Sequence, residues 1–218
     1  RAMHIPKGSE WFAKDITTVK YGDLPEAECY CFGFPCQSFS IAGSRGGFAD
    51  TRGTLFFEVM RLAKARKPEY LFAENVAGLL SHDGGRTFGT ILATLGELGY
   101  WWEYQVLNSK NFGVPQNRER VFIIGHLGGR GGREIFPIQK GTTTTLGEKT
   151  FYVTSESKQF YSRRRGVIPC LLSSKGRDYL IEENNRFLTP KEWFRTQGFP
   201  DEYFERAARV NSNSQLYK

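Results

Sequence analysis

The chain has 218 residues, 39% hydrophobic and 24% charged, so it can bury a sizeable core and is neither disordered nor fibrous. Lys and Arg number 30 against 23 Asp and Glu, and this net charge of +7 favours polyanionic partners such as nucleic acid. Apolar runs too short for a membrane helix, the absence of a signal-like start and only four cysteines together predict a cytoplasmic protein without a membrane partner.

Strand-like and helix-like segments alternate over the first two thirds of the chain. The predicted strands are 29–34, 70–73, 100–107 and 121–124, and the predicted helices are 53–66 and 86–98. Strands that alternate with helices through short links are typical of βαβ units. The sequence therefore predicts an α/β domain whose sheet is mostly parallel.

Two details of these elements predict burial. Cys29 and Cys31, inside the first strand, read as small buried hydrophobic residues. One face of the first helix should pack on the sheet, and its members are Leu55, Phe56, Val59, Met60 and Ala63.

The composition changes after His126. Residues 127–185 are rich in Gly, Thr, Ser and Arg and show no helical period, so we expect a smaller, irregular or β-rich module there. Regular structure should return at Arg186. Thr189, Pro190 and Glu192 form a capping-box sequence, which predicts a helix through Gln197 that Gly198 ends.

A cysteine directly follows the first predicted strand, in Gly33–Ser40 (GFPCQSFS). The carboxyl ends of strands are where open α/β sheets bind ligands. Pro35 stiffens the approach to Cys36, and the Gly/Ser-rich stretch Ser38–Gly53 is expected to be a mobile lid. A small buried residue is the more frequent role of a lone cysteine. Zinc held by Cys29, Cys31 and Cys36 is disfavoured, because no C-x-x-C pair or nearby His accompanies them.

Polar residues also mark two later strands. Glu74 is expected where the second strand ends, at the same sheet edge as Cys36, and a nucleophile beside a carboxylic acid suggests covalent catalysis. Arg118 and Arg120 should share one face of an extended segment and could hold a phosphate or a polar base edge. Taken alone, Glu74 could be a solvated carboxylate and the arginines could form surface salt bridges.

The chain resembles the DNA cytosine-C5 methyltransferase family in the order and spacing of these segments. They are Phe34–Gln37, Glu74–Val76, Gln116-x-Arg118-x-Arg120, and Arg186-x-Leu188-Thr189-Pro190-x-Glu192 followed by Gln197–Pro200. The resemblance covers about residues 13–126 and 186–215. It implies a Rossmann-like, S-adenosylmethionine-dependent catalytic domain in 1–126, a target-recognition module in 127–185, and a return to the catalytic domain in 186–218.

The resemblance also implies a role for each catalytic residue. The thiolate of Cys36 would add to C6 of a flipped-out cytosine, and Glu74 would hold or protonate N3. Arg120 would hold the base O2, while Arg118 would support the loop around the cysteine. The methyl group of S-adenosylmethionine would then move to C5 and leave S-adenosylhomocysteine, with no metal involved.

The family's cofactor and DNA contacts can be assigned to residues of this chain less completely. Asp15 matches the position that contacts the adenine, with Ile16 beside it, while Pro35 and Leu55 resemble positions that line the cofactor cleft. The family's glycine-rich cofactor loop belongs upstream of Asp15 and is apparently missing. The expected DNA contacts are Gln37, Ser38, Ser40, Arg45, Arg163, Arg164 and Arg165, although the last three could equally form a solvated basic turn.

The sequence thus predicts a monomeric DNA (cytosine-5-)-methyltransferase of prokaryotic or phage origin that acts on double-stranded DNA. A restriction endonuclease for the same site is a candidate partner. Two alternatives remain open. One is a catalytically silent DNA-binding relative, which would not need Cys36. The other is a tRNA cytosine-C5 methyltransferase of the same fold, which the Pro-Cys-Gln sequence and the sizeable middle module disfavour.

Overall fold

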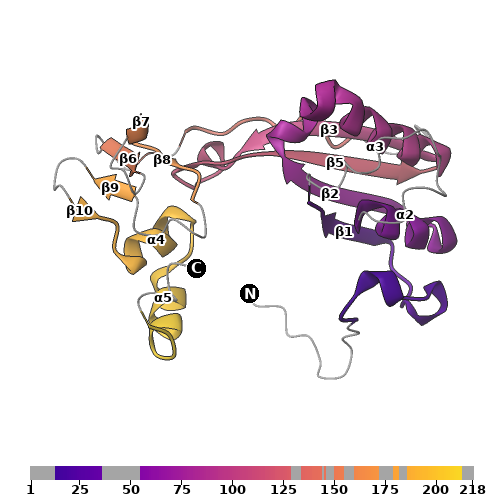
Figure 1. Cartoon of the computed structure of the whole chain (residues 1–218), viewed down its shortest axis with the longest axis horizontal. Coiled ribbons are helices and arrows are strands. Elements are labelled where there is room, and N and C mark those ends of the chain that lie inside the picture. Colours follow the sequence, from indigo (N-terminus) through magenta and orange to yellow (C-terminus); the bar gives the residue numbers. More distant parts are fainter. Residues whose placement is uncertain are drawn as a thin grey trace. The chain divides into compact units, whose positions relative to one another are not determined.

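The computed structural model describes residues 13–35, 55–128, 134–143, 145, 150–154, 160–171, 179–181 and 186–212 (Figure 1). The chain divides into two compact units. Unit 1 comprises Arg1–Val106 and Arg120–Ile138, and unit 2 comprises Leu107–Glu119 and Gln139–Lys218. The two units are defined by packing and not by function. The functional domains 1–126, 127–185 and 186–218 therefore stay predictions.

Unit 1 is built on a four-stranded sheet in the order β1-β2-β5-β3. The strands are β1 (Cys29–Gly33), β2 (Tyr70–Val76), β3 (Tyr100–Asn108) and β5 (Glu119–Leu127). β1 and β2 are parallel, as expected, but β5 runs antiparallel to β2. The sheet is therefore mixed, and the expected parallel direction is wrong for β5. The connection from β3 to β5 contains no crossover helix, so the chain turns straight back.

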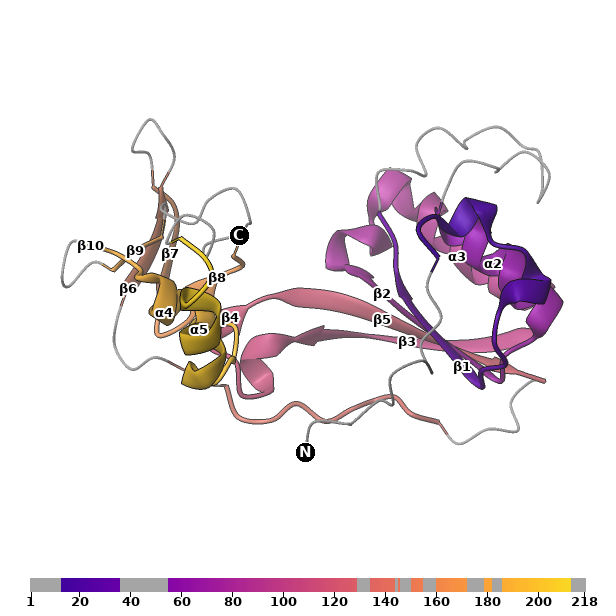
Figure 2. The same ribbon diagram turned by 90° about the horizontal axis from the view of Figure 1, so that it is seen from below.

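Two helices cover one face of this sheet, α2 (Leu55–Arg66) and α3 (Arg86–Glu97) (Figure 2). Their buried residues pack on alternate residues of the strands, including Leu71 and Ala73 of β2 and Val121 and Ile123 of β5. The predicted helix face is correct except for Leu55, which is 43% exposed at the start of α2. Gly99 ends α3 with φ +85°, as the sequence predicts.

The opposite face of the sheet carries the other set of alternate side chains. Phe72 of β2 and Phe122 of β5 stack there, with ring centroids 5.7 Å apart. The expectation that Cys29 and Cys31 are buried is wrong, because both are exposed on this face and their sulfurs lie 3.7 Å apart. They point away from α2 and α3, so neither helix covers them.

Short 3-10 helices connect the elements of unit 1 and begin unit 2. They are η1 (Ile16–Thr18), η2 (Tyr21–Asp23), η4 (Ala77–Leu80), η5 (His82–Gly85) and η6 (Ser109–Asn111). Within the described ranges no helix is long and apolar enough to span a bilayer.

Unit 2 holds a second four-stranded sheet in the order β10-β9-β6-β7, and a short parallel pair, β4 with β8. The strands are β4 (Gln116–Asn117), β6 (Thr150–Thr154), β7 (Phe160–Arg165), β8 (Ile168–Pro169), β9 (Tyr179–Ile181) and β10 (Arg186–Phe187). Strands β6 to β9 give residues 127–185 the expected β content. Arg163–Arg165 pair with β6 as part of β7, so the alternative of a basic turn is wrong.

Two helices follow β10, α4 (Pro190–Thr196) and α5 (Asp201–Ala208). The predicted capping box is confirmed: the hydroxyl of Thr189 accepts from the Glu192 amide, and Glu192 accepts from the Thr189 amide. Trp193 of α4 joins a small core with Ile168, Tyr179 and Leu188. Gln197 caps α4, and Gly198 follows with φ +84°.

Candidate active site

An ion pair joins Glu74 and Arg120 near the carboxyl end of β2. Nε of Arg120 donates to Oε1 of Glu74 over 2.7 Å, and the side chains are 18% exposed for Arg120 and 37% for Glu74. Val76 pairs with Arg120 across the two strands, which puts both charged side chains on the sheet face opposite α2 and α3. Glu74 lies within β2 and not at its end, because the strand continues to Val76.

The carboxyl end of β1 lies next to Glu74 and is held there by β2. Gly33 pairs with Glu74, and a Cβ on Gly33 would stand 3.4 Å from Oε2 of Glu74, so the carboxylate lies over that glycine. Nδ2 of the buried Asn75 donates to the carbonyl of Phe34 over 2.7 Å. The chain beyond Pro35 therefore starts next to Glu74, although Cys36 itself lies outside the described residues.

Arg118 belongs to unit 2, where the end of β3 fixes its backbone. The amide of Arg118 donates to Oδ1 of Asn108 (3.2 Å), and its carbonyl accepts from the Ser109 amide (3.1 Å). Nδ2 of Asn108 donates to Oδ1 of Asn117, and the Ser109 hydroxyl donates to the Gln116 carbonyl. The guanidinium of Arg118 contacts Sγ of Cys170 at 3.6 Å, so this arginine does have a thiol neighbour, but not the expected one.

The described cofactor candidates fit the role that the resemblance implies. Asp15 is exposed, and its Oδ1 accepts from the amide and the hydroxyl of Thr17, which hold the pKa of Asp15 below its ordinary value. A charged, exposed acceptor of this kind suits an adenine amino group. Ile16 packs against the core, while Pro35 and Leu55 expose apolar surface that a cofactor could cover.

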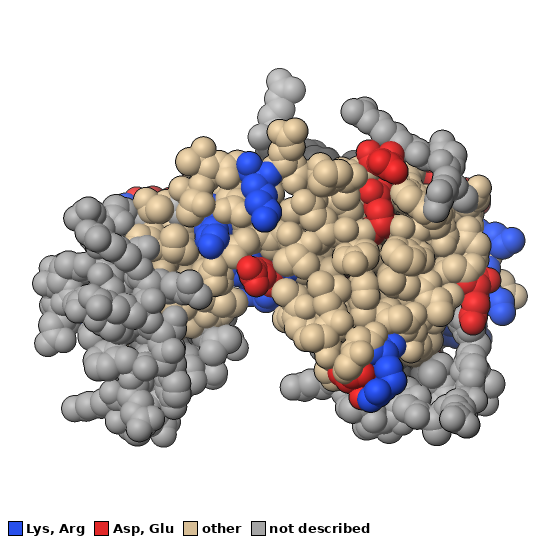
Figure 3. Space-filling model, turned by 90° about the horizontal axis from the view of Figure 1, so that it is seen from above, with Lys and Arg blue, Asp and Glu red and all other residues tan. Residues whose placement is uncertain are grey.

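The expected DNA contacts are not brought together by the described residues. Gln37, Ser38, Ser40 and Arg45 lie outside them, as does the predicted lid. The backbone of Arg163, Arg164 and Arg165 belongs to β7. On the face seen in Figure 3, the Lys and Arg side chains of the described residues form small separate groups with Asp and Glu among them.

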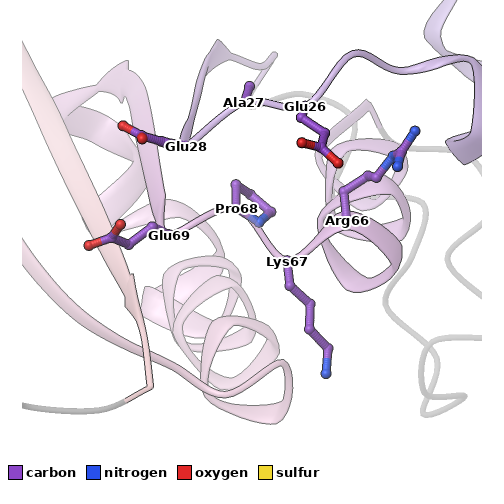
Figure 4. Close-up of a pocket in the computed structure, with 7 residues that line it drawn as sticks. All are labelled: Glu26, Ala27, Glu28, Arg66, Lys67, Pro68 and Glu69. Carbon is purple, nitrogen blue, oxygen red and sulfur yellow. The ribbon is translucent and has the colours of Figure 1, made fainter.

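An open pocket of about 460 Å³ lies at the opposite edge of the sheet from Glu74 (Figure 4). Its lining residues precede β1 and β2 and are Glu26, Ala27, Glu28, Arg66, Lys67, Pro68 and Glu69. Ligands of open α/β sheets bind at the carboxyl ends of strands, so we do not assign the active site to this pocket. Among the residues with described positions, no group of three His, Cys, Asp or Glu side chains could hold a metal ion.

Sequence reasoning missed the positioning roles of Asn75 and Asn108. Asn75 and Asn108 are buried side chains whose polar atoms are paired with backbone groups at strand ends. A polar residue at the end of an apolar strand was the available signal for each. Each holds the backbone of a segment that leads to or carries a predicted catalytic residue, Cys36 for Asn75 and Arg118 for Asn108.

Comparisons with known proteins agree with this geometry. A family model described as C-5 cytosine-specific DNA methylase matches residues 7–163. The chain is 36% identical to the Type II methyltransferase M.NlaX of Neisseria lactamica, over 90% of this chain and 72% of that protein. It is 37% identical to M.HpaII of Haemophilus parainfluenzae, over 89% of this chain and 73% of that protein. The Dnmt2 methyltransferase of S. pombe has the same fold, with a TM-score of 0.57, 18% identity, and coverage of 93% of this chain and 75% of that one.

Proposed function

The chain belongs to the C-5 cytosine-specific DNA methylase family, and we propose that it methylates C5 of a flipped-out cytosine in duplex DNA through a covalent bond between Cys36 and C6. The observation that carries the proposal is the Glu74–Arg120 pair beside the strand end that leads to Cys36. A carboxyl group and a guanidinium at one sheet edge match the N3 and O2 atoms of a cytosine ring, which lie side by side.

Each residue has one chemical task in this proposal. The thiolate of Cys36 adds to C6, and Glu74 protonates or hydrogen-bonds N3, so electron density moves to C5. Arg120 donates to O2, and because a guanidinium has five N–H donors it can serve O2 and Glu74 in one complex. S-adenosylmethionine supplies an electrophilic methyl group. After methyl transfer, loss of the C5 proton returns an electron pair to the ring and expels the Cys36 thiolate.

The base must leave the helix for this chemistry, because C6 is shielded inside a duplex. Flipping costs a few kcal/mol of unpairing and unstacking. Asn75 supports the step indirectly, since it holds the Phe34 carbonyl and so the start of the loop that carries Cys36. Asp15, Ile16, Pro35 and Leu55 are the residues we assign to the cofactor.

We assign recognition of a DNA sequence to residues 127–185, with Arg163–Arg165 among the contacts, together with Gln37, Ser38, Ser40 and Arg45 of the segment after Cys36. The names of the Type II relatives place those proteins in restriction-modification systems. An endonuclease with the same site is therefore a partner to search for, and we expect the methyltransferase to act on DNA as a monomer.

A trapping experiment tests this function. DNA that carries 5-fluorocytosine should form a covalent adduct with the protein in the presence of S-adenosylmethionine, because fluorine cannot leave C5 as a proton does. Cys36→Ser should abolish the adduct. Cys170→Ser should keep it, because Cys170 contacts Arg118 but is not proposed to attack the base. An adduct in Cys36→Ser, or methyl transfer to tRNA and not to duplex DNA, would contradict the proposal.

A further inference from the structure

Two side chains of β3 hold the backbone of the segment that follows β5. Glu103 accepts from the amide of Ile135 (3.1 and 3.2 Å to its two oxygens) and from the amide of Phe136 (2.8 Å). Gln105 accepts from the Ile138 amide over 2.7 Å and donates to the Ile138 carbonyl over 3.0 Å. Residues 134–143 form no helix or strand. The side chains of Glu103 and Gln105 therefore supply hydrogen bonds that a neighbouring β-strand would otherwise give to this backbone.

A buried histidine of β5, His126, contacts the carboxylate of Glu103. Nε2 of His126 lies 2.7 Å from Oε1 of Glu103, and the side chains are 4% exposed for His126 and 9% for Glu103. The rings of Tyr70 and Trp101 pack against the imidazole. Burial raises the pKa of Glu103, but the two amides and His126 outweigh it and hold that pKa below its ordinary value.

The two ring nitrogens of His126 have different surroundings. Nδ1 is buried and has no hydrogen-bond partner among the described residues. A buried, unpaired polar atom is unfavourable, so the hydrogen-bonding contribution of the imidazole comes from its other nitrogen, Nε2. This nitrogen donates to Glu103, which in turn orders the Ile135 and Phe136 amides.

The place of this arrangement in the chain gives it a function. Unit 1 ends at Ile138 and Gln139 continues in unit 2, so the first residues of the segment 127–185, to which we assign recognition, pack as part of unit 1. We propose that Glu103, together with His126 and Gln105, is a positioning residue that fixes the place where the recognition segment 127–185 leaves unit 1. This inference rests on the proposed function, because that proposal assigns DNA recognition to residues 127–185.

Glu103→Gln tests the proposal with little change of shape. Three N–H donors face the carboxylate, and an amide would turn one acceptor into a fourth donor. Hydrogen exchange at Ile135 and Phe136 should accelerate by about 10- to 100-fold, the range for losing hydrogen bonds to a charged group. Small-angle scattering should show a larger radius of gyration. In methyl transfer, KM for DNA should rise about tenfold while kcat and KM for S-adenosylmethionine stay nearly constant.

Matched variants separate positioning from a general loss of stability. Glu97→Gln removes an equal charge from the exposed end of α3 and should change none of these quantities. His126→Gln keeps an N–H donor toward Glu103 and should preserve most of the slow exchange, whereas His126→Phe should not. Gln105→Met removes the oxygen that accepts from the Ile138 amide and should accelerate exchange at Ile138 even if Glu103→Gln fails to fold.

Two results would overturn the proposal. One is unchanged exchange at Ile135 and Phe136 in Glu103→Gln. The other is a fall in kcat with an unchanged KM for DNA, which would mean that Glu103 supports the catalytic face. If the wild-type protein transfers no methyl group to DNA, the proposed function fails, yet exchange and scattering still decide whether Glu103 fixes the exit of the chain.

Discussion

The side chain of Asn75 and the carbonyl of Phe34 are joined by a 2.7 Å hydrogen bond between two neighbouring strand ends. Asn75 follows Glu74 in sequence, and Phe34 precedes Cys36 by two residues. One buried bond thus links the backbone of the two segments to which we assign the chemistry. Its loss should disturb both together.

Asn75→Asp removes the donor and places a carboxylate opposite a carbonyl oxygen. We expect the free energy of unfolding to fall by about 1–3 kcal/mol, the cost of leaving a buried polar group unsatisfied. The rate of adduct formation with 5-fluorocytosine DNA should fall as well. Urea titration and gel analysis of the adduct measure the two effects.

Asn211→Asp is the matched control for Asn75→Asp. Asn211 also donates from Nδ2 to a carbonyl, that of Ala207, but it is exposed, so its replacement should cost little. Equal losses in the two variants would contradict the role we give to the Phe34 bond.

Glu74→Gln keeps the shape of the side chain and removes the acid. Turnover should fall by about 10²–10⁴-fold, the usual contribution of a general acid or base. The Kd for DNA should change little, because a carboxylate makes no favourable contact with phosphate. Glu58→Gln breaks an Arg–Glu pair with Arg61 on α2 and should leave turnover unchanged. Equal losses of binding and turnover in Glu74→Gln would mean that Glu74 is structural.

The stability of unit 2 should depend on pH through Glu192. The Arg186 guanidinium, together with the Thr189 amide and hydroxyl, lowers the pKa of Glu192 from 4.5 to about 2. A lowered pKa in the folded state stabilises the fold above pH 4.5, and this contribution disappears as the pH falls from 4.5 toward 2. Urea midpoints between pH 7 and pH 3 should therefore fall less steeply in Glu192→Gln than in the wild type. Parallel curves would show that Glu192 does not contribute.

Exchange of residues 127–185 with those of a relative that methylates another site should transfer the methylated sequence. Phosphate contacts give affinity without sequence information, whereas base-edge contacts give specificity. Bisulfite sequencing of plasmid DNA reads the outcome, and Cys36→Ser in the chimaera should abolish methylation. Active chimaeras that keep the original site would place recognition elsewhere in the chain.

The elements of the fold were predictable where one local rule dominates. The capping box at Thr189 and the stop at Gly99 depend on neighbouring residues only, and both are confirmed. The direction of β5 and the exposure of Cys29 and Cys31 depend on which strands and helices become neighbours. Apolar periodicity does not contain that information, so these predictions were wrong.

The candidate site also has a part that the sequence predicts and a part that it does not. The resemblance implies that Glu74 and Arg120 hold N3 and O2 of one cytosine, and an ion pair between the two side chains is observed. The supporting residues could not be predicted, because the partners of Asn75 and Glu103 are backbone groups 41 and 33 residues away. A polar residue in an apolar strand can mark such a position, but it cannot identify the partner, because backbone atoms are the same in every sequence. The roles of Cys36 and of the arginines of β7 stay predictions.

The hydrogen bonds of the Asn108 side chain limit which residues can replace it. Its Oδ1 accepts from the amides of Lys110 and Arg118, and its Nδ2 donates to Asn117 and Glu119, all from a buried position. Aspartate has the acceptors without the donor, and leucine has the size without either. In a library of all substitutions selected for methylation, position 108 should therefore retain asparagine almost alone, while exposed positions of the same strand accept many residues.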